Sequence, residues 1–189
     1  SSAITGTGGL TLSGSGTLVL SGAGGGLTGP IVVNSGTLQL ATANYFNTTG
    51  GGTTVWLSDV KSKPSNAILA VNANNTISAL NSDGSNSAVT IATGVTLTVG
   101  DSNNLNSVLS STITGTGTGS LVKAGTGLFD ISGSGGVSFG AGGSVTVDAG
   151  ALRIGNGVFG TSATTPINVL AGAELQYSGN GGSVFNDPI

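Results

Sequence analysis

Acidic side chains are the main candidates for acid–base chemistry in this chain, because the sequence has no His and no Cys. A nucleophilic triad, thiolate chemistry and a soft-metal site are therefore excluded. Enzymes that cleave polysaccharides need only carboxylates converging on one groove, or carboxylates with calcium and an arginine. The acids of the chain are Asp59, Asp83, Asp101, Asp130, Asp148, Glu174 and Asp187.

Asp130 and Asp148 are the only acids within one sequence repeat, about one coil apart. They would stack on the outer face of adjacent coils, with Arg153 nearby. A solvated polar position explains them better, because a catalytic site needs several converging groups. We expect a protein that is not an enzyme, with no catalytic, cofactor-binding or metal-binding residues and no cofactor.

Two glycine patterns and one Asp/Asn cluster resemble binding motifs, but each is better explained as part of the fold. Gly24, Gly26 and Gly29 fit a dinucleotide-binding spacing, as do Gly155, Gly157 and Gly160, but no helix follows to bind a phosphate. Residues 101–104 have calcium-loop residue types without the Gly and distal Glu of an EF-hand. We interpret them as a hydrogen-bonded corner.

Thr112, Thr114, Thr116 and Thr118 would lie on a single strand face. Regular threonine arrays on flat solenoid faces order water in several ice-binding proteins, so ice binding is a hypothesis. It requires threonine pairs in every coil, and the sequence does not repeat them. The β-strand preference of threonine is the simpler explanation.

Short strands closed by glycine corners are the elements that would position all these residues. Apolar residues alternate with polar ones in pairs such as Leu10 and Leu12, which predicts strands with one buried face. The segment 29–40 aligns without a gap with 143–154, and 15–22 aligns with 126–133. This internal repeat predicts an all-β solenoid over residues 1–189, a single domain.

Four corner glycines, Gly36, Gly94, Gly150 and Gly172, set the expected coil length. If the intervals between them span three, three and one turns, each coil has about 19–22 residues, in the range of β-solenoid repeats. We therefore expect about nine coils stacked at the spacing of parallel strands.

The repeat resembles the passenger-associated β-strand repeat of bacterial autotransporters. The resemblance is carried by residues 115–155 and by residues 14–40, and residues 41–66 depart from it. The matching positions are Leu121, Lys123, Gly125, Gly127, Phe129, Ile131, Gly133, Val145, Val147, Ala149, Gly150, Leu152 and Ile154. The resemblance implies a right-handed parallel β-helix, secretion and display at a bacterial cell surface, with no catalytic residues.

Charge and hydropathy narrow the function classes. Only 6% of residues are charged, against about 25% in ordinary soluble domains, and the net charge is −3. With four basic residues in total, the chain has no nucleic-acid footprint. No apolar run reaches the length of a membrane helix. The chain starts at Ser1 with no visible signal peptide, which favours a processed or excised segment.

Residues 41–66 break the strand rhythm, and we expect an extended corner or loop there. An extended corner with its aromatic residues folded onto the solenoid is the simpler interpretation. The alternative is a protruding contact surface for a host or matrix partner, with Tyr45, Phe46 and Trp56 as its aromatic anchors.

Neither end of the sequence reads as a cap, although the terminal coils of a solenoid expose unpaired strand edges. The terminal coils would pair with a neighbouring copy, which gives a homo-oligomer or polymer, or with the adjoining solenoid of a longer chain. The residues that would make this contact are Leu10, Leu12, Val184, Phe185 and Ile189. The primary hypothesis is an autotransporter-like stalk or adhesion scaffold. The alternative is a self-assembling subunit of an extracellular filament or sheath, and polysaccharide or ice binding is third.

Overall fold

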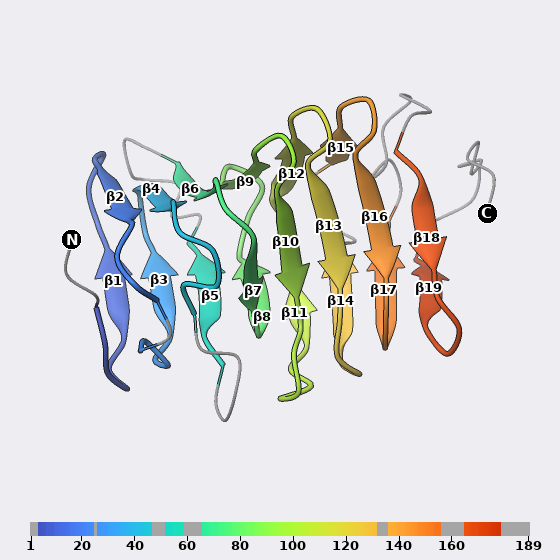
Figure 1. Cartoon of the computed structure of the whole chain (residues 1–189), viewed down its shortest axis with the longest axis horizontal. Helices are drawn as coiled ribbons and strands as arrows, with labels where there is room; N and C mark the ends of the chain where they lie inside the picture. The colour runs from blue at the N-terminus through green and yellow to red at the C-terminus, as the bar shows by residue number, and fades with distance from the viewer. Residues whose placement is uncertain are drawn as a thin grey trace.

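The computed structural model describes residues 4–24, 26–46, 52–58, 66–131, 136–155 and 165–178. These residues form an all-β solenoid in which every strand pair is parallel (Figure 1). The fold class expected from the repeat is confirmed. Among the described residues there is no helix with the length and hydropathy that a membrane span requires.

Three faces run along the solenoid, and we name them A, B and C. Face A contains β1 (Leu10–Leu12), β3 (Ile31–Val33), β5 (Thr54–Leu57), β8 (Ala79–Ser82), β11 (Ser107–Val108), β14 (Leu128–Ile131), β17 (Ala151–Ile154) and β19 (Glu174–Tyr177). Face B contains β2 (Thr17–Leu20), β4 (Gly36–Leu40), β6 (Ala67–Val71), β9 (Ala88–Ile91), β12 (Thr112–Gly115) and β15 (Val137–Phe139). Face C contains β7 (Asn75–Ile77), β10 (Thr96–Val99), β13 (Ser120–Lys123), β16 (Ser144–Val147) and β18 (Ile167–Val169).

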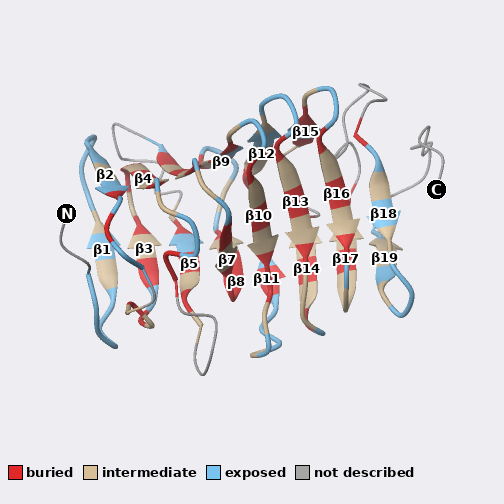
Figure 2. Ribbon diagram, viewed as in Figure 1, coloured by how far each residue is buried: buried red, intermediate tan, exposed pale blue. Residues whose placement is uncertain are grey.

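The core is a ladder of inward side chains from all three faces. On face B, for example, Leu38 pairs with Leu69 and Leu69 with Val89, and all three side chains are fully buried. The outward positions between them are polar or small, so burial alternates along nearly every strand (Figure 2). The sequence shows the same alternation at period two. It places every second side chain of a strand in the core, where it stacks on the corresponding side chains of neighbouring coils.

The coils are longer and fewer than the sequence predicted. Face A is crossed by eight successive strands, from β1 to β19, so the described part of the chain makes about seven turns rather than nine. Paired residues lie 20 residues apart between Leu18 and Leu38, 24 apart between Leu97 and Leu121, and 31 apart between Leu38 and Leu69. The prediction was wrong because it treated the corner glycines as equivalent positions in the coil.

Those glycines lie at different corners. Gly36 starts β4 at the corner from face A to face B, and Gly94 lies between β9 and β10 at the corner from B to C. Gly150 and Gly172 both lie at the corner from C to A. All four have positive φ, between 68° and 86°, so each makes a tight turn that other residues rarely adopt. The same strand–glycine–strand pattern therefore occurs at three different corners, so the distance between two such glycines in the sequence does not give the number of residues per coil.

Face A has one seam, between β8 and β11, where side-chain oxygens take the place of strand-to-strand backbone bonds. The backbone N–H of Leu80 donates to Ser107 Oγ at 3.0 Å, and that of Val108 donates to Asn81 Oδ1 at 2.9 Å. Ser82 Oγ accepts from the N–H groups of Ser110 and Ser111. The two four-stranded sheets of face A are thus joined into one surface.

Candidate functional surface

Tyr45 and Phe46, two of the three residues of the alternative contact surface, are core residues, as the simpler interpretation of aromatics folded onto the solenoid favours. Tyr45 is 1% exposed and Phe46 is 4% exposed, and their rings meet edge to face at 5.4 Å. The N–H of Tyr45 donates to Asn75 Oδ1 at 2.8 Å, which places Tyr45 one coil before the inward position of β7. These two residues fill the face-C side of a coil that has no strand there, so they are unavailable to a partner.

Trp56 is the exposed member of the three. It lies on β5, a regular strand of face A inside the stretch predicted to be irregular, and it is 43% exposed. Residues 47–51 and 59–65 of that stretch lie outside the described part of the chain. The strand registers place Trp56 between Val32 of β3 and Asn81 of β8, all three at outward positions. Trp56 is therefore part of a longer outward row.

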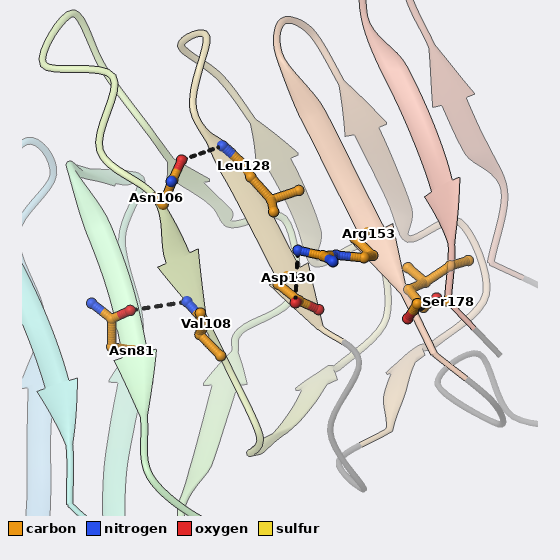
Figure 3. Close-up of polar contacts among 8 residues, drawn as sticks. Asn81, Asn106, Val108, Leu128, Asp130, Arg153 and Ser178 are labelled. Atoms are coloured by element: carbon orange, nitrogen blue, oxygen red, sulfur yellow. Dashed lines mark hydrogen bonds and ion pairs between the residues drawn. The ribbon is translucent and has the colours of Figure 1, made fainter.

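We call this row the face-A row. Its order follows from the strand registers and from the seam bond between Asn81 and Val108. The members are Thr11, Val32, Trp56, Asn81, Val108, Asp130, Arg153 and Gln176. Figure 3 shows its central part, with Asn81, Val108, Asp130 and Arg153 on successive strands. Eight strands at a spacing of about 4.8 Å give a row about 34 Å long.

Asp130 and Arg153 form an ion pair at the centre of the C-terminal half of this row. Arg153 Nη2 lies 3.2 Å from Asp130 Oδ2, and the side chains are 36% and 13% exposed (Figure 3). Arg153 Nε is buried with no partner among the described residues. The register of β14 with β17 brings the pair together, as the expectation of Arg153 near Asp130 required.

Asp148 lies elsewhere, so the expected stack of Asp130 and Asp148 is not formed. Asp148 follows β16 at the corner from face C to face A, where its N–H donates to the carbonyl oxygen of Lys123 at 2.8 Å. Within the described ranges, no group of three or more His, Cys, Asp or Glu side chains is placed to hold a metal ion. Asp130 on face A and Asp148 at the corner before it therefore do not form a stacked pair.

Asp101 is held by its own corner. Its carboxylate accepts from Ser78 Oγ, from the N–H of Asn103 at 2.8 Å and from Asn103 Nδ2 at 2.9 and 3.0 Å. This is the hydrogen-bonded corner expected from the sequence. Asn104 and Asn106 extend it, since their Oδ1 atoms accept from the N–H groups of Thr126 and Leu128 in the next coil.

Among the described residues, the charged side chains lie on face A and at the corners, apart from the buried Lys123. Every strand of faces B and C in the described residues has uncharged outward side chains, many of them Thr or Ser. The threonine array splits accordingly: Thr112 and Thr114 lie outward on face B, whereas Thr116 and Thr118 lie at the corner before β13. The four residues do not share one flat face.

Sequence reasoning missed two features of this surface. The continuity of the face-A row depends on which residues of neighbouring strands pair, and a single sequence does not reveal that pairing. The buried position of Lys123 was not recognised either, although alternation with Leu121 put it at an inward position.

Comparison of the chain with protein-family models, with curated proteins and with solved structures gave no match. The resemblance to the autotransporter passenger repeat therefore rests on the sequence phrase alone.

Proposed function

We propose that this chain is a non-catalytic structural protein of the autotransporter-passenger type, a stalk or adhesion scaffold displayed at a bacterial cell surface. The observation that carries the proposal is the continuous inward ladder, in which each coil buries its apolar residues against the coils on either side. Such a solenoid gains length with each added coil, and its stability is close to a sum over neighbouring coils. Length and outward faces are what a stalk needs.

The low charge and the uncharged faces B and C agree with a scaffold that holds its outward side chains in fixed rows. Secretion and surface display are proposed from the passenger-like phrase in residues 115–155. The test is proteolytic shaving of intact cells that produce the parent protein. We expect peptides of this chain to be released from intact cells; peptides released only after lysis would exclude surface display.

A second experiment tests the stalk role on the purified chain. Leu97 pairs with Leu121, so deletion of residues 97–120 removes one coil and joins Thr96 to Leu121 in register. We expect this variant to keep its β-sheet circular dichroism and to unfold cooperatively. The control is deletion of residues 97–121, one residue more than the coil, which puts the outward residue Val122 at the inward position of Leu97, turns Lys123 outward and should abolish folding. Loss of the fold in both variants would argue against a length-tolerant rod.

The alternative function is end-to-end assembly into a filament or sheath, and one observation favours it. The inward residues of the terminal coils are only partly buried, notably Leu10, Leu12 and Leu175, and β1, β18 and β19 lack the buried positions of inner strands (Figure 2). Leu175 and Tyr177 of β19 are in phase with Leu10 and Leu12 of β1 for continued parallel pairing. Val184, Phe185 and Ile189 lie outside the described residues.

Sedimentation velocity and negative-stain microscopy over a concentration series test this alternative. Assembly predicts rods that lengthen with concentration. Leu12→Lys should block assembly by placing a charge at the pairing edge, whereas Val108→Lys, at an outward position of the inner strand β11 that is 53% exposed, should not. Separate single-copy rods at every concentration would exclude self-assembly.

A further inference from the structure

The N-terminal half of the face-A row presents an apolar platform. Trp56 projects outward with 43% of its surface exposed, and Val32 lies next to it on β3. Across the seam, Val108 is 53% exposed. An exposed indole ring supplies a flat apolar face with one N–H donor at its edge. A partner that combines an apolar face with polar groups at its edge would match this ring.

The C-terminal half of the row presents hydrogen-bonding groups in the same line. Arg153 has five N–H donors, of which the ion pair with Asp130 uses only part, and its side chain is 36% exposed. Gln176 follows on β19, where its Nε2 donates to Glu174 Oε2 at 3.1 Å. Planar amide, carboxylate and guanidinium groups at successive strands can exchange hydrogen bonds with a hydroxyl-rich partner.

Charge and length restrict the partner further. The outward charges of the described face-A strands are Asp130, Arg153 and Glu174, which leaves one net negative charge over those strands. This near balance does not attract a strongly charged polymer of either sign. A row about 34 Å long is also far larger than one sugar or one small ligand needs, and its members lie at a regular spacing that the parallel strands fix.

From these features we propose that the face-A row binds a neutral polysaccharide lying along the solenoid axis, with Trp56 stacked on the apolar face of one sugar ring and Arg153 bonded to hydroxyl groups further along. The proposal deepens the proposed scaffold role, because it identifies the class of partner that this scaffold would hold. It involves no bond cleavage, in agreement with the separated carboxylates.

Trp56 is the only tryptophan in the chain, so its fluorescence reports on this surface alone. The experiment titrates the purified chain with soluble neutral polysaccharides built on glucose, mannose, galactose or xylose, and with their monosaccharides. We expect a saturable shift of the emission with at least one polymer and none with the monosaccharides. An anionic alginate and a cationic chitosan should leave the emission unchanged.

Variants are compared by affinity electrophoresis in gels that contain the polymer found to bind. Trp56→Ala should weaken binding by about tenfold or more, and Arg153→Gln by a few-fold. Val19→Ala on face B is the matched control, since it removes an exposed apolar residue elsewhere and should leave binding unchanged. Circular dichroism of each variant verifies the fold.

Three results would overturn the inference: no emission shift with any of the four neutral polymers, equal retardation of Trp56→Ala and the wild type, or equal binding of the charged polymers. The scaffold role fails by different measurements, namely cell shaving and coil deletion. A chain that passes those two and fails here is a stalk without a glycan-binding face.

Discussion

The ammonium group of Lys123 donates to the carbonyl oxygen of Ala149, one coil further along the chain, at 3.1 Å. It also donates to the carbonyl oxygens of Ala124 at 2.6 Å and Gly125 at 2.8 Å in its own coil. Three donors thus meet three acceptors, although Lys123 is only 1% exposed and lies inward between Val99 and Val147. A buried cation therefore ties together the corners of two adjacent coils.

Replacing Lys123 by Met removes the three donors and keeps the length of the side chain. Buried acceptors left without partners cost about 1–3 kcal/mol each, so we expect the free energy of unfolding to fall by at least about 1 kcal/mol. Urea denaturation measures the change. Lys123→Gln, which keeps an NH₂ group, should lose less than Lys123→Met, and equal stability of Lys123→Met and the wild type would show that the three bonds contribute nothing.

Burial also predicts a pH dependence. Desolvation lowers the pKa of Lys123 from its usual 10.5. Between the lowered folded-state pKa and 10.5, the unfolded chain binds more protons than the folded chain, so stability rises with pH in that window. Relative to Lys123→Met, which cannot titrate there, the wild type should gain stability as pH approaches 10.5. A relative loss would mean that the carbonyl contacts raise the pKa instead.

Gly150 should not tolerate a side chain. Its φ is +68°, and a Cβ atom would lie 2.5 Å from the carbonyl oxygen of Gly125 and 2.6 Å from that of Gly127. The left-handed conformation alone costs a non-glycine residue about 1–2 kcal/mol, so Gly150→Ala should lose at least that much. Gly16→Ala is the control, because nothing lies within 4 Å of its Cβ position. Similar thermal midpoints for the two variants would contradict this account.

Asn106 replaces a backbone acceptor between coils. Its Oδ1 accepts the N–H of Leu128 at 2.8 Å on the surface of face A (Figure 3). Asn106→Ala should lower the free energy of unfolding by about 0.5–1.5 kcal/mol, while Asn106→Asp keeps an oxygen acceptor and should retain most of it. Asn168→Ala, at an exposed position of β18, serves as the control. If Asn106→Asp and Asn106→Ala lower the free energy of unfolding equally, the hydrogen bond to Leu128 does not contribute to stability.

Tyr45 tests the revised position of the aromatic pair. Truncation of a fully buried aromatic side chain typically costs about 3–5 kcal/mol, so Tyr45→Ala should strongly destabilise the chain. Tyr177→Ala removes the other tyrosine, which is 41% exposed, and should cost much less. Calorimetry of both variants compares them directly. A small effect at Tyr45 would restore it as a surface residue.

The fold was predictable because alternation is local. Pairs such as Leu38 and Leu40 identify the inward face of a strand without knowledge of the partner strand. The coil count was not predictable, because Gly36, Gly94 and Gly150 lie at three different corners that look alike in sequence. A corner is defined by which strands it joins, and that depends on contacts 20 or more residues away.

The surface was predictable only in part, for the same reason. The neighbourhood of Asp130 and Arg153 followed from the repeat, whereas Asp148 was misplaced by counting residues across a corner. The folding of Tyr45 onto the solenoid was the simpler interpretation of the sequence, but its place in the core could not be read from residues 41–46, because they do not alternate although the chain there still supplies an inward residue. Its register is set by Asn75, which bonds to the backbone of Tyr45 rather than continuing a strand ladder.

The seam between β8 and β11 has a consequence for how the rod comes apart. In a solenoid each coil is stabilised mainly by its neighbours, so order spreads along the axis from any nucleus. Growth across this seam depends on Ser82, Asn81 and Ser107 being correctly oriented, in addition to the backbone. Faces B and C keep their backbone ladders past this level, since β9 pairs with β12 and β10 pairs with β13. We therefore expect local opening to begin on face A at the seam, so that the amide protons of Leu80 and Val108 exchange faster than those of the paired strands β9 and β12 on face B.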